Sequence, residues 1–524
     1  MRNFRRTSQI IFLLLFLWLL IQTEYHGKDI ISYPVKVFLD FDPLILFSSL
    51  LAAHGIPPAF PMAMFWGLVL VGMTLLLGRF FCGWVCPLGT LHHFIGWLKN
   101  RKLPIKAKME RGRYRPSQRW KYLILIGLLV ASVFTLQVVG LLDPLSLFIR
   151  SLALSINPAV NYLTRAGFNF LYFTDISMIT AVSEPVYSFL KTFYLSFKQP
   201  FFQQSIFLGL IFLFIVGLNF YRHRYWCRYL CPLGALLGVL SRYTPLRLKV
   251  SKECTNCMVC VAGCEGGAEP HSTDSWRSAE CVVCWNCVKS CPKGAVSFVI
   301  PTRRKKDAPY IDVGRRRLIT SAVAGLAAVP LLRVGREYKG FNPELIRPPG
   351  ALAEGEFLRR CVRCGECMKV CLTNAIHPAL LEAGLEGLWT PMLVMKMGYC
   401  EYYCTLCGQV CPTGAIRKLP LEEKQKLHIG TAFIDKSRCI PYTLATNCIV
   451  CEEHCPTPKK AIWFEEVEVV NREGERVVVK QPRVDPQLCI GCGVCEYKCP
   501  VIDKPAIYVT SIGESRSPDN QLII

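Results

Sequence analysis

The chain has 524 residues, which at about 150 residues per domain suggests three or four domains. Hydrophobic residues make up 52% of it, which excludes a disordered chain, and 28 cysteines in a chain of this length exclude a small secreted disulfide scaffold. Only 19% of the residues are charged, yet the formal net charge is +23. The remaining classes are a cysteine-rich metalloprotein and a membrane protein, and the order of the motifs indicates both.

The positive charge is concentrated beside apolar runs. One basic block extends from Lys99 to Lys121, and a second extends from Arg303 to Arg317. Blocks in this position follow the positive-inside rule of membrane proteins. No nucleic-acid-reading motif accompanies them, so we predict contact with membrane lipid and no nucleic-acid partner.

Four nearly uncharged stretches have about the length of membrane spans, since about 20 helical residues cross a hydrocarbon core of about 30 Å. They are Thr7–Thr23, Ile56–Gly78, Tyr122–Leu142 and Gln199–Tyr221. The first is short, and a signal peptide is the alternative interpretation of it. No small-residue cleavage site follows, so we predict a retained anchor.

The loops between these spans predict the topology. The N-terminus and the segments 99–121 and 222–252 are rich in Lys and Arg, which places them on the cytoplasmic side. The segments 24–55 and 143–198 are poor in both and are expected outside. The aromatic residues between 162 and 202 are typical of an interfacial belt on the outer side, with a quinone pocket as the alternative.

The membrane part contains an internal repeat. Each half carries an Asp-Pro-Leu turn, at Asp42 and Asp143, and a Cys-x3-Cys-Pro-Leu-Gly motif after its second span. Two parallel repeats are related by a pseudo-twofold axis along the membrane normal, which predicts that the two motifs meet. Their thiols are those of Cys82, Cys86, Cys227 and Cys231. Clustered thiolates commonly hold iron–sulfur clusters, so we predict a shared additional Fe–S cluster; buried structural thiols in tight turns are the alternative.

Two cysteine runs after Lys252 have the spacing of a bacterial two-cluster ferredoxin. In that arrangement the fourth cysteine of each run binds the cluster of the other run. The predicted ligand sets are Cys254, Cys257, Cys260 with Cys291, and Cys281, Cys284, Cys287 with Cys264. Zinc ribbons also use paired Cys-x2-Cys motifs, but three closely spaced cysteines with an offset fourth fit zinc poorly.

Four further runs occupy the C-terminal third. They are Cys361, Cys364, Cys367, Cys371; Cys400, Cys404, Cys407, Cys411; Cys439, Cys448, Cys451, Cys455; and Cys489, Cys492, Cys495, Cys499. The second and third runs have a longer first gap, which leaves the last three cysteines of each run at ferredoxin spacing. We therefore predict six [4Fe–4S] clusters in all. The spacing leaves open which runs exchange their fourth cysteine.

The segment between the two cysteine-rich parts carries Arg315, Arg316 and Arg317 before a short uncharged run that ends at Leu332. An arginine pair before such a run is typical of a twin-arginine export signal. Because clusters are inserted inside the cell, an exported cluster domain must cross the membrane folded. The alternative is a short helix that links two cytoplasmic modules.

Other cofactor motifs are missing from the sequence. There is no Cys-x-x-Cys-His motif, dinucleotide fingerprint or P-loop, so we predict no haem c, flavin or NAD site. His92, His93 and His223 lie at helix ends, where we expect positions at the cytoplasmic interface.

These motifs carry a specific resemblance. With its two Cys-x3-Cys-Pro motifs and double-cluster runs, the segment 1–300 resembles NapH-type membrane ferredoxins, which are related to NosR and CcoG proteins. The segment 310–524, with its four runs and twin-arginine-like signal, resembles NapG/MauM-type ferredoxins. The resemblance implies a fusion of two partners that take electrons from membrane quinol and pass them to periplasmic cytochromes or reductases.

The resemblance also implies a pairing of the C-terminal runs, the first with the fourth and the second with the third. The implied sets are Cys361, Cys364, Cys367, Cys499; Cys489, Cys492, Cys495, Cys371; Cys400, Cys404, Cys407, Cys455; and Cys439, Cys448, Cys451, Cys411.

The predicted fold is a multidomain chain: an α-helical membrane domain of four transmembrane helices in two parallel repeats, one further short span, and α+β bacterial-ferredoxin-like cluster domains. The predicted boundaries are 1–250 for the membrane domain, 251–300 for the two-cluster domain, 301–340 for the basic linker and 341–524 for the four-cluster domain. We predict a multi-pass protein of the bacterial inner membrane, with the two-cluster domain cytoplasmic and the four-cluster domain periplasmic.

The predicted function is electron relay between the quinone pool and a periplasmic or membrane-bound cytochrome or reductase subunit in anaerobic respiration. No catalytic residue is predicted; at most the chain is the electron-transfer component of a quinol dehydrogenase. The alternative is a maturation or regulatory redox protein of the CcoG/NosR kind, which reduces a metal centre of a respiratory enzyme.

Overall fold

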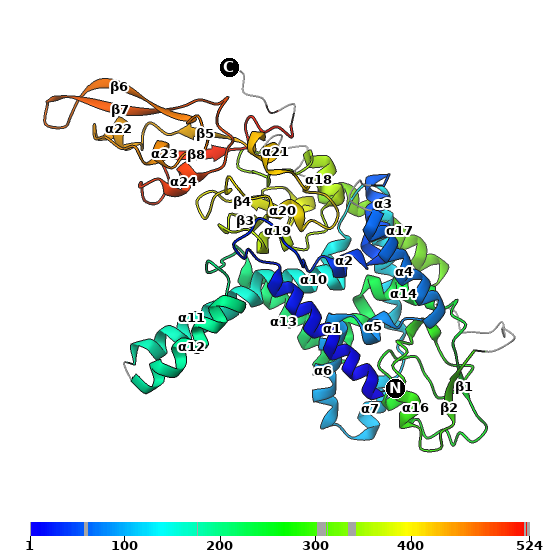
Figure 1. Cartoon of the computed structure of the whole chain (residues 1–524). Coiled ribbons are helices and arrows are strands. Elements are labelled where there is room, and N and C mark those ends of the chain that lie inside the picture. Colours follow the sequence, from blue (N-terminus) through cyan, green and yellow to red (C-terminus); the bar gives the residue numbers. More distant parts are fainter. Residues whose placement is uncertain are drawn as a thin grey trace. The chain divides into compact units, whose positions relative to one another are not determined.

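The computed structural model describes residues 2–56, 61–174, 177–300, 311, 313–333, 342–517 and 520. The chain forms two compact units that interleave along the sequence (Figure 1). Unit 1 comprises Met1–Ile21, Val35–Ser151 and Ile206–Leu331, and unit 2 comprises Gln22–Pro34, Leu152–Ser205 and Leu332–Ile524. The basic residues at 303–306 lie outside the described residues.

Unit 1 is built mainly from helices. The longer ones are α1 (Arg2–Gln22), α3 (Pro43–Ala53), α4 (Pro61–Leu77), α6 (Pro87–Arg101), α7 (Ile105–Gly112), α8 (Trp120–Val133), α10 (Pro144–Ser151), α13 (Ser205–Tyr221), α14 (Pro232–Ser241) and α17 (Arg315–Arg333). The shorter ones are α2 (Val37–Asp40), α5 (Phe81–Trp84), α9 (Val139–Leu142), α15 (Val259–Ala262), α16 (Asn286–Ser290), η1 (Pro116–Arg119), η3 (Trp226–Leu230) and η4 (Ser278–Glu280).

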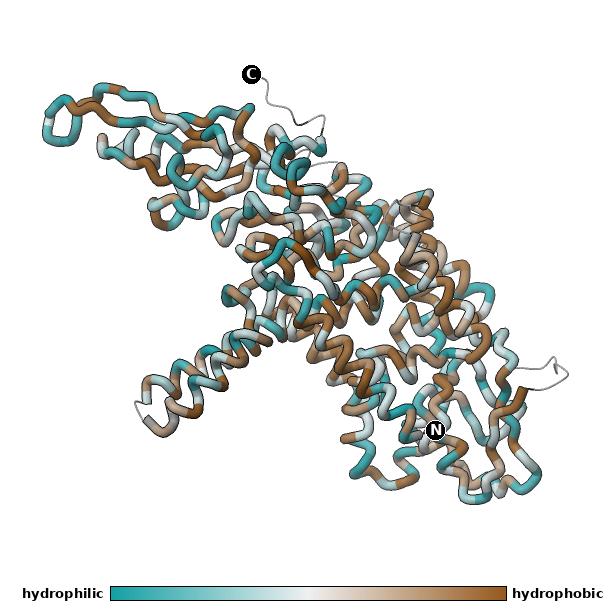
Figure 2. The backbone as a smooth tube through the Cα atoms, in the orientation of Figure 1, coloured by the Kyte–Doolittle hydropathy of each residue, from teal (hydrophilic) through white to brown (hydrophobic). Residues whose placement is uncertain are grey.

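The predicted spans correspond to helices of unequal length. One described helix, over Asn3–Gln22, is long and apolar enough to cross a membrane, and the apolar helices at Met62–Leu77 and Ser205–Tyr221 are shorter. Figure 2 shows hydrophobic residues along α1, α4 and α13. The third predicted span is wrong as one continuous helix: α8 ends at Val133, and Thr135 has a φ of 64°, a left-handed conformation that interrupts a helix.

The two predicted repeats have the same local structure. The Asp42 carboxylate accepts hydrogen bonds from Leu44 N (2.8 Å) and Ile45 N (3.3 Å) at the start of α3, and Asp143 does the same at the start of α10. Both aspartates are buried and precede a proline, which favours the first helical position. The repeat in the sequence is therefore a repeat of helix starts.

The first cysteine-rich module of unit 1 has a ferredoxin-like frame. Strand β1 (Arg247–Val250) pairs antiparallel with β2 (Val296–Val299), so the segments before the first run and after the second run lie side by side. Val261, Trp276 and Val296 form a core with cysteine side chains around it. The thiol loops are thus held between a small sheet and two short helices.

Unit 2 carries the C-terminal cysteine runs and two helices from the middle of the chain. Its helices are α11 (Asn157–Phe173), α12 (Ser177–Phe193), α18 (Glu354–Arg360), α19 (Glu366–Lys369), α20 (Leu406–Gln409), α21 (Leu421–Lys426), α22 (Ile440–Thr443), α23 (Val450–Glu453), α24 (Val494–Lys498), η2 (Leu152–Ile156) and η5 (Leu385–Gly387). Its strands are β3 (Ile376–Pro378), β4 (Pro391–Leu393), β5 (Thr431–Ile434), β6 (Ile462–Val470), β7 (Arg476–Val484) and β8 (Ile507–Thr510).

Backbone pairing divides these runs into two tandem ferredoxin-like halves. Ala351, before the first run, forms an antiparallel bridge with Ile416, after the second run. Strand β5, before the third run, pairs with β8, after the fourth run. The long β6–β7 hairpin is inserted between the third and fourth runs. Each half therefore encloses two consecutive runs.

Candidate metal centres

One of the two ligand sets predicted for the first module comes together in the structure. It is the set of Cys264 with Cys281, Cys284 and Cys287. Burial raises the pKa of the Cys284 thiol to about 11, and the neighbouring Cys264 contributes to that rise. Cys264 also contributes to the raised pKa of the Cys281 and Cys287 thiols. The fourth cysteine of the first run therefore lies with the second run, as in two-cluster ferredoxins.

In unit 2 the pairing implied by the resemblance is wrong. One cavity is lined by Cys361, Cys364, Cys367 and Cys411, and another by Cys439, Cys448, Cys451 and Cys499. The first run thus exchanges its fourth cysteine with the second run, and the third run with the fourth. The reason is the backbone pairing, which closes each half around two consecutive runs.

The two remaining groups complete this pattern. Burial raises the pKa of the Cys404 thiol to about 12. The charge of Cys371 also contributes to the raised pKa of Cys404, and to that of Cys400 and Cys407, so Cys371 lies with these three thiols. Cys455 contributes likewise to the raised pKa of three thiols of the fourth run, so it lies with them. They are Cys489, Cys492 and Cys495. The backbone N–H of Cys400 donates to the carbonyl of Cys492 at 2.8 Å, so these two inner groups are adjacent. The two halves of unit 2 therefore meet at their inner thiol groups.

The thiols of the two Cys-x3-Cys motifs also come together. All four are buried, and Cys82 interacts electrostatically with Cys86, Cys227 and Cys231. Cys86 precedes α6 and accepts a hydrogen bond from Gly89 N at 3.4 Å, while Cys231 precedes α14 and accepts from Gly234 N at 3.2 Å. A helix N-terminus stabilises a thiolate, so the repeat places one anion-stabilising turn in each half.

The four thiols of the two Cys-x3-Cys motifs, named the membrane thiols after their predicted location, offer one ligand for each iron of a [4Fe–4S] cluster. Among the described residues, no three His, Cys, Asp or Glu side chains are close enough to share a single metal ion. A [4Fe–4S] cluster has a different requirement, because each of its four thiolates binds a separate iron. Four buried thiols from two matched turns meet that requirement.

Two buried acids connect this site to the first module. Glu265 follows Cys264, and its carboxylate lies 2.8 Å from His223 Nε2 and 3.0 Å from His93 Nε2. Burial alone would raise the pKa of Glu265, but the two histidines outweigh it and hold that pKa well below its usual range. His92 and His223 are buried, and the position of the three histidines at the cytoplasmic interface stays a prediction.

Glu280, which precedes Cys281, is the second buried acid. It forms an ion pair with Lys121 and accepts a hydrogen bond from Tyr122 Oη at 2.9 Å. Lys121 is fully buried. Part of the basic segment predicted to face the cytoplasm is thus covered by the first module.

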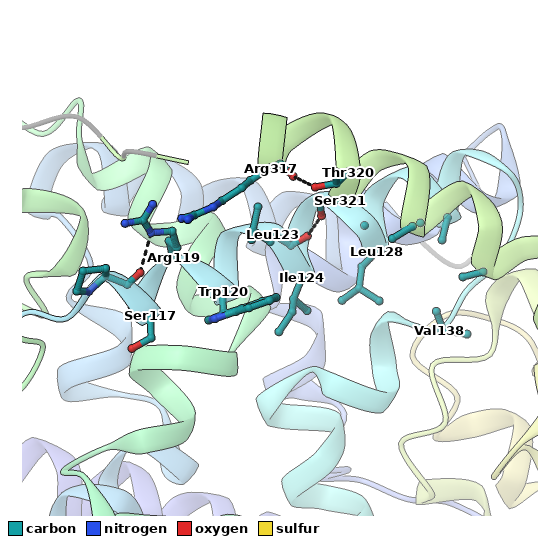
Figure 3. A pocket seen from close by; sticks show the side chains of 16 residues that line it. Ser117, Arg119, Trp120, Leu123, Ile124, Leu128, Val138, Arg317, Thr320 and Ser321 are labelled. Atoms are coloured by element: carbon teal, nitrogen blue, oxygen red, sulfur yellow. Dashed lines mark hydrogen bonds between the residues drawn. The ribbon is translucent and has the colours of Figure 1, made fainter. Parts of the chain in front are cut away.

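A mostly apolar groove of about 780 Å³ lies between α8 and α17. Figure 3 shows Arg119 and Arg317 toward one end of it and Val138 toward the other. The two helices approach closely at Gly127 and Gly325, where a Cβ on Gly325 would lie 2.3 Å from the Gly127 carbonyl oxygen. Small residues of this kind permit close helix packing in membranes.

Comparison with known proteins agrees with these thiol groups. A family described as "4Fe-4S binding domain" matches residues 59–106 and 204–253, and each matched segment contains one Cys-x3-Cys-Pro motif. The chain is 35% identical over 202 residues to the ferredoxin-type protein NapG of Escherichia coli, covering 37% of this chain and 85% of that protein. No solved structure matches.

Two further relatives have the same character. The methylamine utilization ferredoxin-type protein MauM of Methylorubrum extorquens is 36% identical over 204 residues, covering 37% of this chain and 88% of the relative. The ferredoxin-type protein NapF of Escherichia coli is 28% identical over 199 residues, covering 38% and 97%. The gathered thiols and these matches define an iron–sulfur electron-transfer protein of the polyferredoxin class. The chain belongs to the family of ferredoxin-type proteins that includes NapG and MauM.

Proposed function

We propose that this chain is a membrane-anchored relay that takes electrons from quinol and passes them to an extracytoplasmic cytochrome or reductase. Six [4Fe–4S] clusters in the ferredoxin-like modules and a seventh at the membrane thiols carry the electrons. The observation that supports it is that each cluster module packs on loops that the charge pattern assigns to one side of the membrane.

In unit 1 the first module packs on segments predicted to be cytoplasmic. Arg5, near the N-terminus, lies 3.8 Å from Glu265, and Lys121 pairs with Glu280. Gly112 lies so close to the module that a Cβ there would be 2.0 Å from the Val261 carbonyl oxygen. Two separate basic segments, the N-terminus and 99–121, thus share one partner.

In unit 2 the C-terminal module, which holds the four cysteine runs from Cys361 to Cys499, packs on segments predicted to be outside. Glu24 forms a largely buried ion pair with Lys369. Asp29 accepts hydrogen bonds from Thr405 N at 2.8 Å and Thr405 Oγ1 at 2.7 Å. A buried ion pair and a bidentate acceptor are costly to leave unpaired, so this contact is specific.

The segment that leads out of the α11–α12 hairpin makes a second contact of this kind. Lys198 Nζ donates to Thr373 O at 3.4 Å and to Tyr497 Oη at 3.3 Å. Both outer segments of the predicted topology therefore contact the C-terminal module. This supports a module on the outer side.

The membrane thiols provide the step between quinol and the first module. Gly83, next to Cys82, packs on Val282, where a Cβ would lie 2.5 Å from the carbonyl oxygen. Trp84 Nε1 donates to Val283 O at 2.9 Å. The loop of one membrane thiol therefore touches the loop between Cys281 and Cys284, with no other element between them.

We place quinol in the groove between α8 and α17, since an apolar groove with polar groups at one end suits an amphipathic ligand. Ala324→Trp, which narrows this groove, is then expected to raise the apparent KM for quinol. Ala327 lies on the same helix but does not line the groove, so Ala327→Trp is the matched control.

The cofactor load is the first expected result. Anaerobically purified full-length protein should contain about 24 irons from six clusters, and about 28 with the seventh. Iron and acid-labile sulfide analysis measures both values. Saturation near eight irons with zinc making up the rest contradicts the proposal.

Quinol-driven reduction tests the relay itself. In liposomes, a reduced short-chain naphthoquinone should bleach the cluster absorbance of the parent, while Cys82→Ser should lose this reduction and keep reduction by dithionite. Equal reduction of parent and variant by quinol contradicts the route through the membrane thiols. Absence of quinol reduction in the parent, with dithionite still effective, favours the maturation role.

A further inference from the structure

Two buried arginines lie among the membrane thiols. Arg79 and Arg224 each stand three residues before the first cysteine of a Cys-x3-Cys motif, and their exposed fractions are 2% and 1%. No motif of ferredoxins assigns them a role. Their identical offset in the two repeats is the signal in the sequence that marks them as a pair.

The two arginines cross from one repeat to the other. Arg79 Nη2 donates to the carbonyl of Cys227 at 3.0 Å, and Arg224 Nη2 donates to the carbonyl of Cys82 at 2.5 Å. Each guanidinium therefore reaches the first cysteine of the opposite motif. Each repeat holds the other in place.

The glycine of each Pro-Leu-Gly turn makes room for this crossing. A Cβ on Gly234 would lie 2.2 Å from Arg79 Nη2, and a Cβ on Gly89 would lie 2.8 Å from Arg224 Nη2. Any larger residue at these two positions would displace a guanidinium. The geometry that the two halves share thus includes the arginine, both thiols and the glycine.

The guanidinium groups also face sulfur. Arg79 Nε donates to Cys82 Sγ at 3.4 Å. Among the described residues, Arg224 Nε and Nη1 are buried without a hydrogen-bond partner, although Nη1 lies 3.8 Å from Glu265. Buried N–H groups are rarely left unpaired, so these donors indicate an acceptor at the thiols.

We propose that Arg79 and Arg224 are positioning residues that raise the reduction potential of an iron–sulfur cluster held by the four membrane thiols. This inference rests on the seventh cluster of the proposed function. In the redox step the cluster would gain one electron and one negative charge. The donor would be oxidised by one electron: either quinol, which also releases a proton, or the neighbouring cluster of the first module. No bond forms or breaks at the cluster.

Two buried positive charges favour the form with the extra negative charge. Hydrogen bonds to cluster sulfur act in the same direction, and both are known determinants of cluster potential. The acids beside them limit the effect, because Arg79 lies 4.0 Å from Glu280 and Arg224 3.8 Å from Glu265. The same acids adjoin Cys281 and Cys264, so the arginines also lie between the two clusters.

An anaerobic redox titration monitored by electron paramagnetic resonance tests this inference on the full chain. The signal of the membrane cluster is first assigned as the one that Cys82→Ser removes. Arg79→Gln and Arg224→Gln should each lower its midpoint potential, so that the reduced-to-oxidised ratio at the parent's midpoint falls about tenfold, which is about 59 mV for one electron. The lysine variants, which keep the charge, should shift it less.

Arg150→Gln is the matched control. Arg150 is also buried in unit 1, and it donates to the backbone carbonyls of Gly140 and Leu141. An unmoved potential in the Arg79 and Arg224 variants, or an equal shift in Arg150→Gln, overturns the inference. So does loss of the cluster in both the glutamine and lysine variants. If Cys82→Ser removes no signal, the seventh cluster itself is disproved instead.

Discussion

The double variant Cys364→Ser/Cys411→Ser is expected to lose about four irons, no more than either single variant, because both thiols line one cavity and serve one cluster. Cys364→Ser/Cys499→Ser is expected to lose about eight irons, because Cys499 lines a different cavity. Iron content per chain and the number of lost resonance signals measure the difference.

The pairing implied by the NapG/MauM resemblance predicts the reverse result for the same two double variants. Cys448→Ser/Cys499→Ser is the internal control, since it repeats the comparison in the other half of unit 2. A loss of about eight irons from Cys364→Ser/Cys411→Ser would show that the runs exchange cysteines across the two halves.

The cysteine runs could be recognised from the sequence because three thiols at short spacing already face one cluster. The exchange of the fourth cysteine could not, since it depends on which distant backbone segments pair. Leu352 N donates to Ala415 O at 3.1 Å, and Arg417 N donates to Gly350 O at 2.8 Å. These bonds join segments more than a whole run apart, and no local spacing encodes them.

The helical part predicted to lie in the membrane shows the same division. The repeat of Asp-Pro and Cys-Pro turns could be predicted because a helix start depends on residues that are neighbours in the sequence. The break after Val133 could not, since the residues at the break, Phe134 and Thr135, are neither proline nor glycine. The roles of Arg79 and Lys121 were hidden for another reason: a charge pattern predicts a side of the membrane, whereas their burial depends on acids in a distant module.

Replacing Arg315, Arg316 and Arg317 with lysine should retain the C-terminal module inside the cell. The substitution preserves charge, but a twin-arginine signal is read by a receptor and not by charge alone. Arg315, Arg316 and Arg317 form the first turn of helix α17, which packs on α8 through Gly325.

Protease added to spheroplasts measures the outcome. In the parent, the C-terminal module should be digested while the first module stays protected until the membrane is lysed with detergent. In the lysine variant both modules should be protected, and the contacts of Glu24 with Lys369 and of Asp29 with Thr405 should be lost, because their two sides then face opposite compartments. A cysteine crosslink between positions 24 and 369 should therefore form in the parent and fail in the variant. If the parent's C-terminal module is protected as well, both modules are cytoplasmic, and the electrons have no outlet on the outer side.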